Sequence, residues 1–117
     1  MTGSAFSLSS FYPADCFSVT EGDTVRGGLK SGPDHRFCPE CMSWLFTVAK
    51  EIEGFVNVRS PMFDDAAEHR PYVEMFRSEA LPGAASGAVR SYEGFPQESE
   101  YPGLIADYSA WDGRVKQ

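Results

Sequence analysis

Two thiols spaced two residues apart are the strongest chemical signal in this sequence. Cys38 and Cys41 stand in the run Phe37-Cys38-Pro39-Glu40-Cys41, and an aromatic, strand-forming segment follows at residues 44–48. In such a C-x-x-C turn both sulfurs lie on one side, where the backbone amides can donate to the thiolates. Zinc in a tetrahedral shell of four sulfur or nitrogen ligands is the usual occupant. The motif predicts a zinc site with Cys38 and Cys41 as ligands, and two further ligands remain to be found.

Three further side chains are candidates to complete the zinc shell. His35 lies three residues before Cys38, although its position also fits a turn histidine that faces solvent. Cys16 stands beside alternating apolar residues, which favours a buried free thiol. His69 lies in a polar segment, where simple solvation is the alternative. A zinc ion shared by the Cys38/Cys41 pairs of two copies of the chain is a further possibility.

Two other interpretations of the cysteine pair stay open. The turn is also compatible with a relic that holds no metal and carries two reduced thiols. A redox C-x-x-C is the third alternative, but such motifs usually open a helix, whereas residues 44–48 favour a strand. A separate cluster of Asp64, Asp65, Glu68 and His69 offers ligands for a hard cation, or else is a solvated acidic loop.

Composition limits the classes of function. The length of 117 residues suggests one domain over 1–117. Hydrophobic residues make up 42% of the chain and aromatic residues 14%, which is enough for a globular core. The net charge of −7 argues against nucleic acid as a partner, because phosphate binding needs a basic surface. No apolar run reaches the ~20 residues that span a bilayer, and residues 1–6 do not form a signal peptide. We therefore expect no membrane partner and a cytoplasmic protein, in which cysteines are metal ligands or free thiols.

Short alternating segments predict a mainly β domain. We expect strands within residues 5–12, 17–20, 25–29, 44–48, 56–58 and 72–76, a break at 13–15 and a loop over 81–87. The spacing of Leu104, Ile105, Tyr108 and Trp111 predicts one face of a short C-terminal helix, with Pro102 in its first turn and Gly113 at its end. We expect the aromatic residues to form one core, either solid or lining a pocket; they are Trp44, Phe46, Tyr72, Phe76, Tyr108 and Trp111.

The order of several short motifs resembles the glutathione-dependent formaldehyde-activating enzyme family, which includes centromere-protein-V-like domains. The motifs are Thr2-Gly3-Ser4-Ala5-Phe6-Ser7, Phe11-Tyr12-Pro13-Ala14-Asp15, Val19-Thr20-Glu21-Gly22, the Cys38–Cys41 turn, and Arg90-Ser91-Tyr92-Glu93-Gly94-Phe95-Pro96 with the region of Trp111. The resemblance implies an Mss4-like fold of coiled β-sheets. It also implies a carbon–sulfur lyase that forms S-hydroxymethylglutathione, with glutathione or a related thiol adduct as partner and zinc as cofactor.

The resemblance also implies two zinc sites, of which this sequence carries only part. By that match Cys38 and Cys41 are the late pair of the structural site. The early C-x-C pair of that site has no counterpart here. Neither does the catalytic C-x-C-x-x-C motif, which is expected just ahead of Thr2. We therefore expect either an activity that is lost or incomplete in this chain or a start upstream of Met1.

A non-catalytic, possibly dimeric Mss4-like binding module is the alternative to the lyase. Without the N-terminal strands of the family, a sheet edge is expected to lack its partner, and such edges are usually covered or paired. A homodimer through that edge is therefore expected. The position after Cys41 also departs from the family, because Met42 replaces the usual glycine. A glycine there favours a positive φ, so we expect a strained or altered turn at Met42.

Overall fold

The structure is a computed structural model and describes residues 2–29, 31–49 and 54–114. The described chain divides into two compact units. The first unit contains residues 2–3 and 7–64, and the second contains residues 4–6 and 65–114. The single domain expected over 1–117 stays a prediction.

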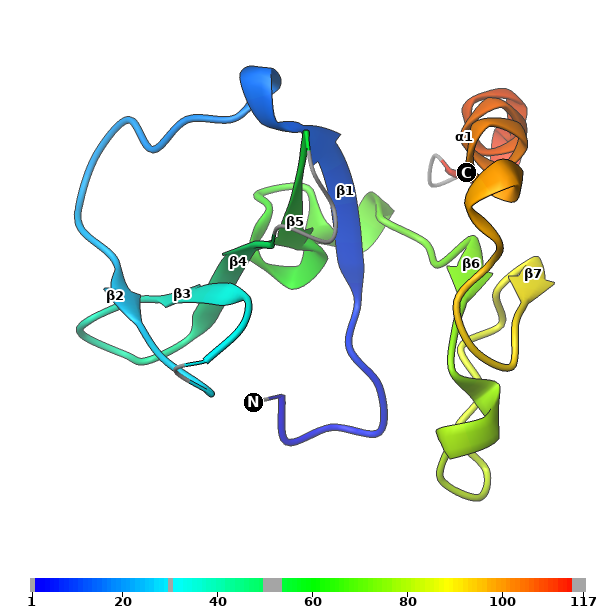
Figure 1. Ribbon diagram of the computed structural model, residues 1–117, viewed down its shortest axis with the longest axis horizontal. Helices are drawn as coiled ribbons and strands as arrows, with labels where there is room; N and C mark the ends of the chain where they lie inside the picture. The colour runs from blue at the N-terminus through cyan, green and yellow to red at the C-terminus, as the bar shows by residue number, and fades with distance from the viewer. Residues whose placement is uncertain (1, 30, 50–53, 115–117) are drawn as a thin grey trace. The chain divides into compact units, whose positions relative to one another are not determined.

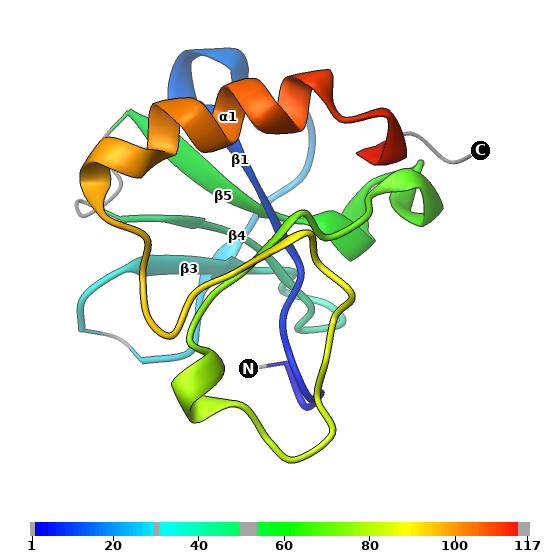
Figure 2. The ribbon, with the colours of Figure 1, turned by 90° about the vertical axis from the view of Figure 1, so that its right-hand side faces the viewer.

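An antiparallel five-stranded sheet forms the first unit (Figures 1 and 2). Its strands are β1 (Ser9–Pro13), β2 (Val25–Arg26), β3 (Asp34–Phe37), β4 (Trp44–Val48) and β5 (Phe55–Arg59). They lie in the order β1-β5-β4-β3-β2, so β2 to β5 form a meander and β1 pairs with β5 at one edge. The prediction of a mainly β fold is confirmed, and β4 has the predicted bounds.

The segment at residues 17–20 is not a strand, contrary to the prediction. After Pro13 the chain makes the 3-10 turn η1 (Ala14–Cys16) and then runs on without strand pairing. The ring of Phe17 packs on that of Phe46, with 4.8 Å between centroids, whereas Val19 is exposed. The alternation of Phe17 and Val19 with polar residues therefore looked like a strand, although only Phe17 packs and the segment is a connection.

The two faces of the five-stranded sheet differ in character. Val56 and Val58 are buried on one face, and Phe46 pairs with Val58 in the register of β4 and β5. The opposite face carries polar side chains: Thr47 pairs with Asn57 in that same register. Paired residues of neighbouring strands point to the same side, so Phe46 and the two buried valines share one face of the sheet.

Gly27 is positioned where only a hydrogen atom fits beside the ring of Phe37. A Cβ atom on residue 27 would lie 2.5 Å from Cδ1 of Phe37. The amide of Gly27 also donates to the carbonyl oxygen of His35 at 3.1 Å. This close approach seats the buried Phe37 at the end of β3, directly before Cys38.

The second unit contains a small parallel sheet and the one α-helix of the described chain (Figure 1). Strands β6 (Val73–Glu74) and β7 (Arg90–Ser91) pair in parallel, and α1 spans Tyr101–Ala110. The 3-10 turns are η3 (Ser60–Met62) in the first unit and η4 (Ala66–Glu68), η5 (Arg77–Glu79), η6 (Glu98–Glu100) and η7 (Asp112–Arg114) in the second. The predicted strand at 72–76 is thus only two residues long, and the predicted loop over 81–87 is confirmed.

The C-terminal helix is confirmed, with differences at its end and on its predicted face. Pro102 lies in its first turn as expected, but the helix stops at Ala110, before Trp111 and Gly113. Tyr72 contacts the rings of Tyr108 and Trp111, with centroids 5.8 and 5.2 Å away. Ile105 was placed on the packed face but is 54% exposed.

The six predicted core aromatics do not form one core. Trp44 and Phe46 belong to the first unit, whereas Tyr72, Tyr108 and Trp111 form a cluster in the second. Phe76 pairs instead with the exposed ring of Phe95 at 4.6 Å. The prediction of one aromatic core was therefore wrong, because aromatic content alone does not show which rings pack together. The helices within the described ranges lack the length and apolar character of a membrane-spanning segment.

Candidate functional site

The Cys38–Cys41 turn joins β3 to β4; the sequence predicted the strand after the turn but not β3 before it. Phe37 pairs with Trp44, and a register shift between Arg36 and Phe37 opens the ladder just before the turn. The amide of Cys38 donates to the carbonyl oxygen of Ser43, and the amide of Met42 donates to the carbonyl oxygen of Cys38, each at 2.9 Å. The turn is therefore closed by its own backbone hydrogen bonds.

Both sulfur atoms of this turn have polar contacts that suit a thiolate. The backbone amide of Cys41 donates to Sγ of Cys38 at 3.5 Å, and Sγ of Cys41 lies 3.2 Å from Oγ of Ser43. Hydrogen bonding to the Ser43 hydroxyl, then to its backbone and to Cys38, lowers the pKa of the Cys41 thiol. Cys38 is half-buried and Cys41 is exposed, so both thiols are free at the surface end of the hairpin.

Met42 adopts the left-handed backbone conformation that the turn demands. Its φ is +60°, a region that non-glycine residues occupy only at an energetic cost. The expectation that methionine is strained here is therefore confirmed. The contacts that hold Met42 in this conformation are the pairing of Phe37 with Trp44 and the hydrogen bonds that close the turn.

The predicted third and fourth zinc ligands are not brought to the cysteines. Among the described residues, no group of three or more His, Cys, Asp or Glu side chains is placed to hold a metal ion. His35 lies in β3 and is half-buried, so its assignment to a solvent-exposed turn was wrong. Its Nδ1 lies 2.7 Å from Oγ1 of Thr47, and its ring meets the indole of Trp44 edge-on at 5.4 Å.

Cys16 is exposed, so the prediction of a buried thiol was also wrong. Cys16 is the last residue of the 3-10 turn η1 and is not part of a strand. The alternating apolar pattern around Phe17 had suggested that the Cys16 side chain would pack in the sheet. The neighbouring carboxylate of Asp15 raises the pKa of the Cys16 thiol, first by a hydrogen bond and then by charge. A raised pKa leaves Cys16 a poorer thiolate ligand than Cys41.

The acidic cluster contains one clear contact instead of a cation site. Nε2 of His69 lies 3.0 Å from Oδ1 of Asp65, four residues earlier in the chain. His69 is half-buried, in contrast to the solvated side chain expected. Asp64 and Glu68 do not join it in a group able to bind a metal within the described residues.

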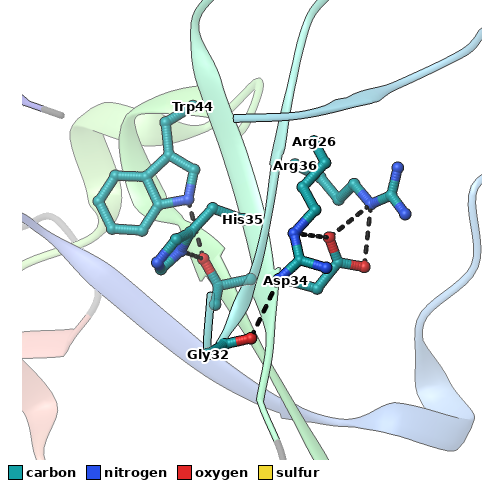
Figure 3. A network of polar contacts seen from close by, with 7 residues as sticks. Arg26, Gly32, Asp34, His35, Arg36 and Trp44 are labelled. Carbon is teal, nitrogen blue, oxygen red and sulfur yellow. Dashed lines mark hydrogen bonds and ion pairs between the residues drawn. The ribbon is translucent and has the colours of Figure 1, made fainter. Parts of the chain in front are cut away.

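Sequence reasoning missed a polar cluster on β3 and β4 that contains His35 and Trp44 (Figure 3). Nε1 of Trp44 and Nδ1 of His35 both reach Oγ1 of Thr47, at 2.8 and 2.7 Å. The guanidinium of Arg59 stacks over the Trp44 ring, 4.3 Å from its centroid. The signal was present in the sequence: Asn57 and Arg59 alternate with the buried Val56 and Val58, which places two polar side chains on the other face of β5.

Strands β2 and β3 also carry ion pairs, on the face of the sheet opposite to His35 and Thr47. Asp34 pairs with Arg36 at 3.0 Å and with Arg26 at 3.9 Å, and Nη2 of Arg26 donates to the Gly32 carbonyl oxygen (Figure 3). All three charged side chains are at least one-third exposed, so these pairs contribute little to stability.

The turn thus directs an amide at Sγ of Cys38, and among the described residues no group of three or more ligating side chains forms around the two cysteines. Neither the curated proteins nor the solved structures gave a significant match to the chain. The sequence model of the glutathione-dependent formaldehyde-activating enzyme family matches residues 1–79, which include the cysteine turn and the whole five-stranded sheet. The match ends before residues 90–96 and Trp111, so it does not extend to the C-terminal motifs of the resemblance. This chain belongs to the glutathione-dependent formaldehyde-activating enzyme family.

Proposed function

We propose that this chain carries the zinc-binding turn of a carbon–sulfur lyase that joins formaldehyde and glutathione as S-hydroxymethylglutathione, with an activity that is incomplete in this chain. One observation carries the proposal. Within the residues that match the family, Cys38 and Cys41 are held in a closed turn, an amide is directed at Sγ of Cys38, and the pKa of the Cys41 thiol is lowered. Zinc bound at such a pair supplies a positive charge that keeps coordinating thiols deprotonated.

The described residues can do part of the work expected of such a site. The amide of Cys41 and the hydroxyl of Ser43 stabilise negative charge on the two sulfurs. The paired residues Phe37 and Trp44 fix the base of the turn, so the sulfurs are presented from a rigid hairpin. The sequence contains one other cysteine and two histidines, and none of them completes a metal-binding group among the described residues.

The lyase assignment is tested by the rate of adduct formation. S-hydroxymethylglutathione formation from formaldehyde and glutathione is followed by NMR exchange, with the zinc-loaded chain and with zinc alone. Acceleration that the Cys38→Ser and Cys41→Ser variants lose, and that Cys16→Ser keeps, supports the lyase. A folded, zinc-loaded chain whose rate equals that of zinc alone contradicts it.

A second candidate is a non-catalytic dimeric module, favoured by two observations. Strand β1 has β5 as its neighbour, and the other edge of β1 has no partner strand within the described residues. Unpaired edges usually associate or are covered. The cysteine turn also provides two sulfur ligands, so a second copy would complete a four-thiolate shell.

Sedimentation equilibrium at micromolar concentration tests this module, together with the zinc content per chain. A dimer with about half a zinc ion per chain, dissociated by a chelator, supports it. Phe11→Lys places a charge on the outer edge strand and is expected to weaken association through that edge. A monomer that binds one zinc ion per chain contradicts the shared site.

The remaining expectations from the resemblance belong to the same proposal. They are an Mss4-like arrangement of coiled sheets, a single domain, glutathione as partner and a cytoplasmic location. The five-stranded antiparallel sheet is compatible with the first, and the family match supports the third.

A further inference from the structure

Arg59 differs in burial and in charge pairing from the arginines that form ion pairs in the described chain. Arg26, Arg36, Arg77 and Arg90 are each at least one-third exposed, and each pairs with an aspartate or glutamate. Arg59 is only 7% exposed, and no carboxylate pairs with it among the described residues. The most buried of these cations is therefore the one without a counter-charge, in a chain with a net charge of −7.

The contacts that Arg59 does make are neutral. Nη1 donates to Oγ of Ser9 at 2.8 Å, and the guanidinium lies over the ring of Trp44. A guanidinium has five N–H donors, and one hydroxyl oxygen leaves most of them unused. Burial lowers the pKa of Arg59, because removal from water disfavours the charged form. A buried cation is costly until an anion pairs with it.

Asn57 supplies the second half of the same feature. It lies two residues before Arg59 on the same face of β5, about 7 Å along the strand. Its Oδ1 is buried and has no hydrogen-bond partner among the described residues. Thr47, which pairs with Asn57, is already engaged by His35 and Trp44. One face of the sheet thus holds unused N–H donors and an unused acceptor, about 7 Å apart along β5.

We propose that this face binds a small peptide-like ligand, whose carboxylate pairs with Arg59 and whose neighbouring N–H donates to Asn57. A planar guanidinium is the group that recognises a carboxylate through two parallel hydrogen bonds. Because Arg59 stacks on Trp44, and Trp44 pairs with Phe37 directly before Cys38, the carboxylate would be held beside the cysteine turn. Naming the ligand as glutathione, which carries carboxylates and peptide N–H groups, rests on the proposed function.

The test compares glutathione with its dimethyl ester on the reduced chain, by isothermal titration calorimetry at fixed ionic strength. The ester lacks the anionic carboxylates and keeps the amides. We expect the ester to bind about 10- to 100-fold more weakly, as befits the loss of a hydrogen bond between charged groups. Arg59→Gln is expected to weaken glutathione binding by a similar factor and to abolish the difference between the two ligands.

Arg36→Gln is the matched control, because Arg36 is a neighbouring arginine already paired with Asp34. It should leave glutathione binding unchanged. Arg59→Lys keeps the charge without the planar fork, so an intermediate loss is expected, and circular dichroism checks that each variant folds. Equal binding of glutathione and the ester to the unchanged chain overturns the inference, as does full affinity in folded Arg59→Gln or the absence of binding.

The same titrations after zinc removal separate this inference from the proposed function. Glutathione binding that needs Arg59 but not zinc, without acceleration of adduct formation, leaves the inference standing and removes the lyase. If Arg59→Gln changes neither the zinc-dependent acceleration nor the glutathione affinity, the lyase stands and the inference is overturned.

Discussion

Sγ of Cys41 lies 3.2 Å from Oγ of Ser43, two residues along the turn. The hydroxyl can donate to the sulfur once the thiol has lost its proton, and this contact is the largest cause of the lowered pKa of Cys41. Cys16, beside the carboxylate of Asp15, has a raised pKa. The neighbouring side chains therefore shift the pKa values of the two exposed thiols in opposite directions.

Ser43→Ala is expected to raise the pKa of Cys41 in the metal-free chain. With the pKa lowered, Cys41 is a thiolate at a lower pH than an ordinary cysteine, and removing the hydroxyl donor shifts its alkylation profile to higher pH. Iodoacetamide labelling as a function of pH, read by mass spectrometry of each cysteine peptide, measures this shift. Cys16 in the same samples serves as the internal control, and an unchanged Cys41 profile would contradict the assigned role of Ser43.

Met42→Gly is expected to stabilise the first unit. Glycine adopts a φ of +60° without the penalty of a Cβ atom, while it gains freedom in the unfolded chain. The net gain is about 0.5–1 kcal/mol in the free energy of unfolding. Chemical denaturation followed by circular dichroism measures it.

Met62→Gly is the matched control for this prediction. Met62 is also an exposed methionine but lies in the 3-10 turn η3 with ordinary backbone angles. Glycine there should destabilise by roughly 0.5–1 kcal/mol. A loss of stability in Met42→Gly of the same size would show that the left-handed position is not strained.

Gly27→Ala is expected to destabilise the hairpin that carries the cysteine turn. The new Cβ would lie 2.5 Å from the ring of Phe37, so the buried ring or the β2 backbone must move. Overpacking of this kind costs about 1–3 kcal/mol. Gly94→Ala, where a Cβ meets no atom within 4 Å, is the control. Equal unfolding free energies for the two variants would contradict the close packing.

Glu74 is expected to make the order of residues 81–87 depend on pH. Oε1 accepts from Ser91 Oγ at 2.6 Å, and Oε2 accepts from Ser86 Oγ at 2.7 Å. These two serine hydroxyls are the largest causes of the lowered pKa of Glu74. A carboxyl whose pKa is lower in the folded state stabilises it above the unfolded pKa, and this contribution is lost as the pH falls through the folded pKa.

Hydrogen exchange at the Ser86 amide measures this prediction. Its protection should fall at acidic pH, and Glu74→Gln should reduce protection at neutral pH and remove that pH dependence. Glu79→Gln alters a nearby glutamate whose carboxylate has no serine contact among the described residues, and it should behave as the unchanged chain does. Ser86 protection that is equally pH-dependent in Glu74→Gln would exclude this carboxylate as the cause.

The strongest local patterns predicted the fold well. Residues 44–48 combine aromatic and β-branched side chains and form β4 with the predicted bounds, and Pro102 opens the C-terminal helix. The pattern failed at residues 17–20, where a single aromatic contact and polar neighbours imitate the alternation of a strand. Periodicity reports which residues pack, but not whether the backbone pairs with another strand.

The candidate site could be predicted only in its local part. Cys38 and Cys41 are close in sequence, so their spacing reveals the turn. The place of His35 depends on cross-strand pairing with Thr47, and that of Arg59 depends on the register of β5 against β1 and β4. Such contacts join residues 12 to 50 positions apart, which spacing along the chain does not encode.

Zinc content per chain, measured by elemental analysis on the reduced protein with thiol titration alongside, tests the central claim most directly. We predict zinc that is lost in Cys38→Ser and in Cys41→Ser and retained in Cys16→Ser. Retention would be accompanied by protection of two thiols from titration until a chelator is added. A folded, metal-free chain with all three cysteines titratable after exposure to zinc would contradict the claim.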